Sequence, residues 1–290
     1  MYPAKFEYYR AKDVPEALQL MAQHSGAKLL AGGHSLLPMM KLRLAQPPAL
    51  IDIGRISELV GVSSDDSRLR VGSLTTHAQL TDSDLLQQHC PLLSEAAGLI
   101  ADPQVRNKGT IGGNLAHADP GSDLPAVILA LDGIVHTTGP HGDRQIKTAE
   151  FFLDLLTTDL QPGELITEIE LPTLAEGTGS SYLKFEHPAS GYAVCGAAAI
   201  VELAADGTCQ SASLCFNGVS ATPHRAAAVS EALVGGKLED ATIDSAVNEH
   251  LKVAEPLGDI YASAEYRVEM AKVFGRRALS SARRQVNARH

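Results

Sequence analysis

Glycine is unusually concentrated in one segment of this chain, Lys108-Gly-Thr-Ile-Gly-Gly-Asn114. Because glycine has no Cβ, such a backbone can lie very close to another group, and its successive N–H groups can surround an anion. A second turn of the same character, Ala31-Gly-Gly-His-Ser35, follows the apolar pair Leu29-Leu30. Two such turns, distant along the chain, predict a fold that brings them together around one pyrophosphate.

Motifs of several common enzyme classes are missing from the sequence. It contains no Gly-x-Gly-x-x-Gly, no Walker A pattern, no His-Glu-x-x-His and no Gly-x-Ser-x-Gly. These patterns build dinucleotide-binding Rossmann turns, P-loops, zinc peptidase sites and hydrolase nucleophiles. We therefore expect neither a nicotinamide site of the usual kind nor a common hydrolase site.

Composition narrows the possible partners. A net charge of −10 and an aromatic content of 4%, without tryptophan, argue against nucleic-acid binding. The four cysteines form no Cys-x-x-Cys pair, so no pattern typical of a metal site or an iron–sulfur cluster is present. No apolar run has membrane-spanning length and the N-terminus lacks the features of a signal peptide. We expect a cytoplasmic protein, held at most at the inner face of the membrane through partners.

The segment 265–290 departs from this acidic balance, with seven Lys or Arg against two Glu. We expect a C-terminal helix with a solvated basic face, whose cations lie near the negative end of the helix dipole. The alternative is a surface that docks onto an acidic partner.

Hydrophobic periodicity predicts strands and helices in mixed order. Near the N-terminus it predicts a β-α-β unit whose helix begins at Asp13, with Pro15 and Glu16 in the first turn. Alternation over 164–172 predicts a strand, and the Gly- and Ser-rich stretch 173–181 a domain boundary. Strands and then helices follow. The expected class is α+β, with a domain at 1–176 (subdomains at about 1–56 and 57–176) and a smaller one at 177–290.

Both glycine-rich turns and the segments downstream make the sequence similar to the FAD-binding medium subunits of molybdenum hydroxylases. Within that family the likeness is greatest to the medium chains of aerobic carbon monoxide dehydrogenases. The resemblance covers essentially the whole chain. It implies a two-subdomain FAD-binding domain of the vanillyl-alcohol-oxidase (PCMH) type, followed by a smaller α+β flavoprotein domain. The segments that carry it are 31–44, 104–114, 122–125, 182–185 and 191–194.

The resemblance also implies which residues contact FAD. Two groups would surround the diphosphate and ribitol. Of four single residues, an acid would contact the cofactor, an isoleucine would lie beside the flavin or adenine, a lysine near the cofactor and a tyrosine near the isoalloxazine. The first group is Ala31, Gly32, Gly33, His34 and Ser35, the second is Thr110, Ile111, Gly112, Gly113 and Asn114, and the single residues are Asp123, Ile166, Lys184 and Tyr192. No catalytic residue and no metal ligand is expected in this chain.

The implied function is electron transfer. A large subunit with the molybdenum cofactor would oxidise the substrate, and a small subunit would pass single electrons through two [2Fe–2S] clusters. FAD in this chain would collect them and reduce an external acceptor such as a quinone, within a dimer of heterotrimers. Carbon monoxide is the expected substrate, and an N-heterocycle or an aldehyde is the alternative. A free-standing flavin dehydrogenase and an assembly module without FAD also remain open.

Three polar residues allow two interpretations each. Lys184 is either a cation that stabilises anionic reduced flavin or a surface lysine beside a strand. His34 and His117 are expected to form hydrogen bonds within loops rather than to transfer protons. His117 and Asp119 are too isolated to predict a metal site.

Overall fold

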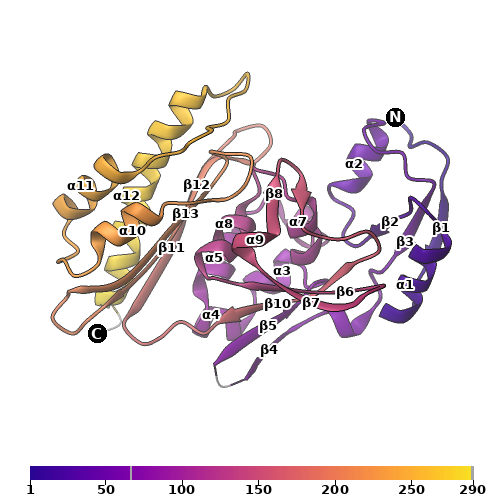
Figure 1. The fold of residues 1–290 in the computed structure, drawn as a ribbon, viewed down its shortest axis with the longest axis horizontal. Coiled ribbons are helices and arrows are strands. Elements are labelled where there is room, and N and C mark those ends of the chain that lie inside the picture. Colours follow the sequence, from indigo (N-terminus) through magenta and orange to yellow (C-terminus); the bar gives the residue numbers. More distant parts are fainter. Residues whose placement is uncertain (66, 289–290) are drawn as a thin grey trace.

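The computed structural model describes residues 1–65 and 67–288 of the chain. Its N-terminal part is a three-stranded parallel sheet of order β1-β3-β2, which helix α1 covers through a small apolar core (Figure 1). The elements are β1 (Glu7–Arg10), α1 (Val14–Gln23), β2 (Lys28–Leu30), α2 (Leu36–Lys41) and β3 (Ala49–Asp52), followed by the 3-10 turn η1 (Ser57–Leu59).

The start of α1 agrees with the sequence pattern. Asp13 Oδ1 accepts a hydrogen bond from the Glu16 N–H at 2.9 Å, and Glu16 Oε2 accepts one from the Lys12 N–H at 2.8 Å. Pro15 occupies the first turn, where the missing N–H needs no partner. This cap fixes where α1 begins and so where the chain turns back into β2, which ends one residue before the turn Ala31–Ser35.

The central part is a five-stranded antiparallel sheet of order β4-β5-β10-β6-β7, with short helices packed on one face (Figure 1). Its elements are β4 (Val62–Asp65), β5 (Arg68–Gly72), α3 (His77–Thr81), α4 (Asp84–His89), α5 (Pro91–Gly98), α6 (Pro103–Arg106), α7 (Ile111–His117), α8 (Asp123–Ala130), β6 (Ile134–Gly139), β7 (Gly142–Lys147), α9 (Thr148–Phe151), β8 (Phe152–Asp154), β9 (Thr157–Thr158) and β10 (Leu165–Pro172).

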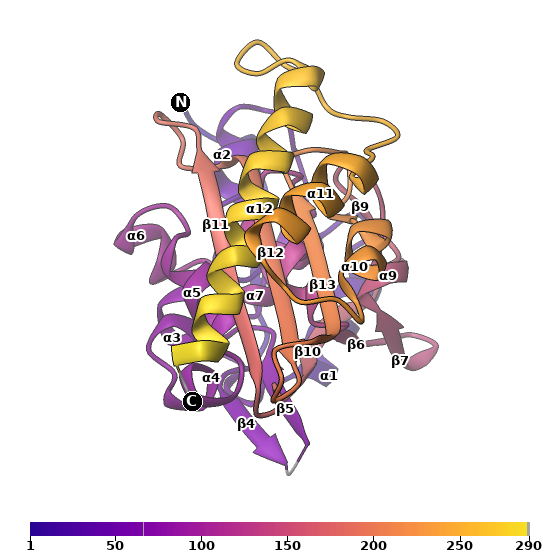
Figure 2. The same cartoon turned by 90° about the vertical axis from the view of Figure 1, so that its left-hand side faces the viewer.

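The C-terminal part is a four-stranded antiparallel sheet with three helices on its outer face (Figure 2). Its elements are β11 (Thr178–Glu186), β12 (Ala193–Leu203), β13 (Cys209–Asn217), β14 (His224–Arg225), α10 (Ala227–Leu233), α11 (Asp240–His250) and α12 (Ala264–Ala288). In α12, Arg276 and Arg283 pair with Asp244 and Asp240 of α11. These contacts favour the expected solvated helix over a docking surface for at least two of its cations.

Helix α8 joins the central and C-terminal parts. All its residues are buried, because it lies between the central core and strands β12 and β13. Lys184 pairs with Asp123 at its N-terminus, and Arg225 binds the Leu129 carbonyl and Asp132 at its C-terminal end. Negative charge at the N-terminus and positive charge at the C-terminus both suit the helix dipole.

The predicted α+β class is confirmed. The expected boundary at 176 falls between β10 and β11 and stays a prediction, since the two parts share one apolar core around α8. Among the residues that the structure describes, no helix combines the length and apolarity needed to span a membrane.

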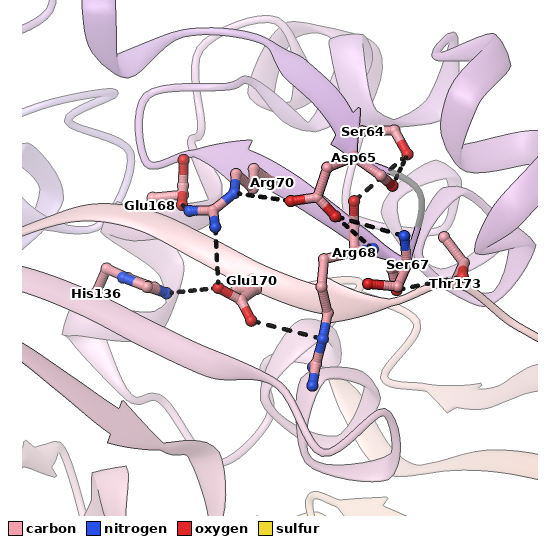
Figure 3. Close-up of polar contacts among 9 residues, drawn as sticks. All are labelled: Ser64, Asp65, Ser67, Arg68, Arg70, His136, Glu168, Glu170 and Thr173. Atoms are coloured by element: carbon pink, nitrogen blue, oxygen red, sulfur yellow. Dashed lines mark hydrogen bonds and ion pairs between the residues drawn. The ribbon is translucent and has the colours of Figure 1, made fainter.

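The outer face of the central sheet carries a ladder of ion pairs (Figure 3). Arg70 contacts Glu168 at 2.8 Å, and Glu170 faces two cations, Arg70 at 3.6 Å and Arg68 at 3.7 Å. The His136 ring nitrogen Nε2 lies 3.1 Å from the same carboxylate. The Glu170 carboxylate is the shared member and its side chain is only 13% exposed. The ladder therefore ties β5, β10 and β6 together on the side away from the helices.

Replacing Glu170 with glutamine is expected to lower the free energy of unfolding by about 1 kcal/mol, because a networked, half-desolvated pair contributes more than an isolated surface pair. Urea unfolding would measure the change. Asp65→Asn is the control, since its side chain is 56% exposed and pairs with one cation of the ladder, Arg70, at 3.7 Å. Its Oδ1 also accepts from the Arg68 N–H at 3.1 Å, a bond that an asparagine amide oxygen can keep. Equal losses in both variants would contradict a special role for Glu170.

Candidate functional site

A cavity of about 1180 Å³ lies where the three parts of the chain meet. One wall comes from α1, β2 and the turn Ala31–Ser35, and another from α7 and the start of α8. The loop 156–166 forms a third wall, and Ser190, Gly191 and Tyr192 extend over it from the C-terminal part. The volume exceeds the usual range of pockets for drug-sized ligands, about 300–1,000 Å³. The cavity is therefore large enough for a dinucleotide.

The turn after β2 presents free backbone donors. No acceptor among the described residues lies within hydrogen-bond distance of the N–H groups of residues 32–36. Gly33 has φ +73°, a left-handed conformation that reverses the chain so that neighbouring N–H groups point the same way. Such a nest of N–H groups is a binding site for an anion, phosphate included.

The second turn differs from the sequence interpretation. The expectation that both turns offer N–H groups to the anion is wrong for residues 111–114, whose N–H groups already have protein acceptors. Ile111 donates to the Thr75 carbonyl and Gly112 to the Ser73 carbonyl. Gly113 and Asn114 donate to the side chain and carbonyl of Thr110. The N–H groups of residues 111–114 are therefore committed to the protein, and most of the free donors come from the first turn.

The glycines of the two turns allow backbone to pack on backbone. A Cβ on Gly32 would lie 2.1 Å from the Lys108 carbonyl oxygen and 2.9 Å from the Gly109 Cα. A Cβ on Gly112 would lie 2.6 Å from the Ser73 Cβ. The predicted meeting of the two turns is confirmed at Gly32, whereas Gly112 is required by the contact with Ser73.

Polar groups without protein partners lie at the cavity wall. Asn114 donates its Nδ2 to Ser122 Oγ at 2.6 Å, whereas its Oδ1 is buried without a partner, as is Ser73 Oγ. Both residues line the cavity. Buried polar atoms normally have hydrogen-bond partners, so these two are available to a bound ligand.

Asp123 belongs to a buried network between the two domains. The Tyr182 hydroxyl donates to Asp123 Oδ1 at 2.6 Å, and Lys184 Nζ donates to Oδ2 at 3.2 Å. Burial raises the pKa of Asp123 to about 6, although Lys184 and Tyr182 act in the opposite direction. Asn217 Oδ1 lies 3.0 Å from the same hydroxyl, and the Asn217 Nδ2 has no partner among the described residues. With the amide O and N exchanged, Nδ2 would donate to the hydroxyl, whose proton goes to Asp123.

Four histidines line the cavity: His24, which follows the end of α1, and His34, His77 and His117. His34 Nδ1 contacts the Gly32 carbonyl at 3.0 Å, and His117 lies 4.0 Å from Asp119. His77 is 3% exposed with Nδ1 unpartnered, and burial lowers its pKa to about 4. In the described part of the chain, no three His, Cys, Asp or Glu side chains gather where they could hold a metal ion.

All but two of the predicted site residues line this one cavity. Ile111 points into the apolar core, and Lys184 lies just behind the wall with its side chain 3% exposed. The interpretation of Lys184 as a surface lysine is wrong, and its contact with a cofactor stays a prediction. Sequence reasoning missed Ser73, His77, the end of α1 and the loop 156–164, none of which carries a recognisable motif.

Comparison with known proteins agrees with this architecture. Residues 4–174 match the family described as FAD binding domain in molybdopterin dehydrogenase, and residues 180–282 match the CO dehydrogenase flavoprotein C-terminal domain. The chain belongs to the family of FAD-binding medium subunits of molybdenum hydroxylases. It is thus an oxidoreductase subunit with an FAD-binding domain followed by a C-terminal flavoprotein domain, as predicted.

Within this family the chain is similar to several medium chains along nearly its whole length. The carbon monoxide dehydrogenase medium chain of Hydrogenophaga pseudoflava is 41% identical over 97% of this chain and 98% of its own. The 6-hydroxypseudooxynicotine dehydrogenase complex subunit alpha of Paenarthrobacter nicotinovorans is 38% identical, over 97% and 96%. A solved structure of the Hydrogenophaga enzyme matches with TM-score 0.93 at 42% identity, covering 97% of this chain and 98% of the other.

The residues at the cavity fit FAD. The nest at 32–36 suits a diphosphate, and the two unpartnered polar atoms, Asn114 Oδ1 and Ser73 Oγ, suit a ligand with many hydrogen-bonding groups. Apolar wall residues, Leu29, Leu165 and Ile166 among them, provide surfaces for flat rings. The cavity wall therefore offers polar groups to the diphosphate of FAD and apolar surfaces to its ring systems.

Proposed function

We propose that this chain is the electron-transferring medium subunit of an aerobic carbon monoxide dehydrogenase. The observation that carries the proposal is similarity along the entire chain to such medium chains from two organisms. The second, from Afipia carboxidovorans, is 39% identical over 98% of each chain. The N–H nest beside a wall of complementary polar atoms supports FAD as the group that this chain holds.

In this proposal two partner subunits complete the enzyme. A large subunit with the molybdenum cofactor oxidises carbon monoxide, and a small subunit carries single electrons through two [2Fe–2S] clusters. Bound FAD supplies the chemistry of the junction, since a flavin exchanges one or two electrons, and a quinone is the proposed final acceptor. The assembly is a dimer of heterotrimers.

In this proposal the residues of this chain bind FAD and orient it. The nest at 32–36 offsets the diphosphate charge with backbone dipoles, which suits an acidic protein. Asp123, Ile166 and Tyr192 hold the ring systems in place, and Tyr192 limits the access of water from the C-terminal side. Its phenol lies by the Ser35 hydroxyl, so it reaches across the cavity to the first turn.

A sister hydroxylase is the second candidate. The subunit of the 6-hydroxypseudooxynicotine dehydrogenase complex is only slightly less similar than the carbon monoxide dehydrogenase chains. Since the large subunit selects the substrate, this chain would serve either enzyme with the same site.

Anaerobic reduction of the purified complex separates these candidates. Carbon monoxide should bleach the flavin absorbance of the complex and leave that of the isolated, FAD-loaded chain unchanged. Bleaching by an N-heterocycle or an aldehyde instead would favour a sister hydroxylase. Substrate turnover by the isolated chain would overturn the subunit role, and a chain that takes up no FAD would leave only an assembly role.

A further inference from the structure

The segment 187–192 is the part of the C-terminal domain that reaches the cavity. It connects β11 to β12, and its residues Ser190, Gly191 and Tyr192 line the wall. The side chain of Tyr192 is packed against Gly121, where an added Cβ would lie 3.1 Å from the ring. The position of this segment therefore determines how the cavity is closed on that side.

Lys184 holds three chain segments at once. Its Nζ donates to the Leu99 carbonyl at 2.6 Å, to the Gly191 carbonyl at 2.9 Å and to Asp123 Oδ2 at 3.2 Å. An ammonium group has three N–H bonds, so all its donors are used. The lysine side chain is 3% exposed, and the low local dielectric strengthens these contacts.

The remaining hydrogen bonds of the segment hold its two ends or stay within it. The His187 N–H donates to the Tyr192 carbonyl at 2.8 Å, and the Gly191 N–H donates to the His187 carbonyl at 2.9 Å. At the far end the Ala193 N–H donates to the Gly121 carbonyl at 3.1 Å. Lys184 thus connects the segment, at Gly191, to the end of α5 and the start of α8 in the FAD-binding domain, while the phenol of Tyr192 lies by Ser35 of the first turn.

We propose that Lys184 is a positioning residue that fixes the segment 187–192 against the FAD-binding domain and so keeps the cavity closed over its ligand. Its ammonium group acts through the Gly191 carbonyl, with the Leu99 carbonyl and Asp123 as anchors, and it does not need to touch the flavin. The part that concerns cofactor retention rests on the cavity being the FAD site, whereas the part that concerns the segment does not.

Amide hydrogen exchange of the full-length chain without FAD tests the first part. In Lys184→Met, a side chain of similar length without donors, the amides of Gly191, Tyr192 and Ala193 should exchange about tenfold faster. Lys237→Met is the control, the same substitution at a lysine that pairs with Asp206 between β12 and β13, and it should change these rates less than about twofold. The Ala199 and Val201 amides in β12 should keep their rates in both variants.

Three results would overturn the proposal: unchanged exchange at residues 191–193 in Lys184→Met, equal acceleration in Lys237→Met, or uniform acceleration that includes β12. Should Lys184→Met fail to fold, Lys184→Gln, whose shorter amide does not reach all three acceptors, carries the same expectation. The rate of FAD release, measured by the recovery of free-flavin fluorescence, should rise about tenfold in the lysine variant. Faster exchange with unchanged FAD release would support the role of Lys184 in fixing the segment 187–192 and would count against the cavity as the FAD site.

Discussion

Replacing Gly32 with alanine is expected to weaken FAD binding about a hundredfold, which corresponds to a loss of about 2.7 kcal/mol of binding free energy. The added Cβ would lie 2.1 Å from the Lys108 carbonyl oxygen and 2.8 Å from the Lys108 carbonyl carbon. Both are backbone atoms of the second turn, so no side-chain rotation relieves the clash. The two turns must separate, and displacements of about 1 Å are enough to disrupt a preorganised site.

Equilibrium titration of the apo-chain with FAD, followed by flavin fluorescence, measures this effect. Gly98→Ala is the matched control, because its Cβ would meet only the Thr81 side chain, at an ordinary 3.5 Å, at the end of α5. It should bind FAD as the unchanged chain does. If Gly32→Ala folded normally and retained FAD affinity within about threefold, the contact between the turns would not be what builds the site.

The sequence predicted that the two turns lie close together, but it did not predict which of their N–H groups are free to bind a ligand. Glycines at 32, 33, 112 and 113 indicated close approach of backbone, and the structure bears this out for Gly32 and Gly112. Gly33 is required instead by its left-handed backbone, and a Cβ on Gly113 would meet the Thr110 side chain. Which N–H groups stay free depends on tertiary partners. The Ser73 and Thr75 carbonyls accept hydrogen bonds from the second turn. These two residues follow β5 and are far from the second turn in the sequence. No local pattern records such a pairing.

The burial of single polar residues could not be predicted from the local sequence either. Lys184 lies on β11, at the edge of its sheet. The packing of α5 against β11 and of α8 against β12 buries its side chain. His77 is the first residue of α3, directly after the N-cap Thr76. Its burial beside Gly109, where a Cβ would lie 2.8 Å from the ring, follows from the turn that covers it.

Asp123 and His77 make opposite contributions to stability over the same pH range. The folded-state pKa of Asp123, about 6, lies above its ordinary 3.8, so the folded chain keeps a proton that the unfolded chain releases. Its contribution is present below pH 3.8 and is lost as the pH rises through 6. The pKa of His77, about 4, lies below its ordinary 6.5. Its contribution is present above pH 6.5 and is lost as the pH falls through 4.

We therefore expect these contributions to cancel in the unchanged chain between pH 4 and pH 6, and to separate in two variants. In Asp123→Asn the free energy of unfolding should rise with pH, because His77 remains. In His77→Gln it should fall with pH, because Asp123 remains. Each slope approaches about 1.4 kcal/mol per pH unit, or up to about 3 kcal/mol over the range. Urea unfolding without added FAD measures all three curves, and the other titrating groups cancel in the differences between them. If the three curves of unfolding free energy against pH ran parallel, the pKa values of Asp123 and His77 would both lie at their ordinary values, and burial at this cavity would not shift them.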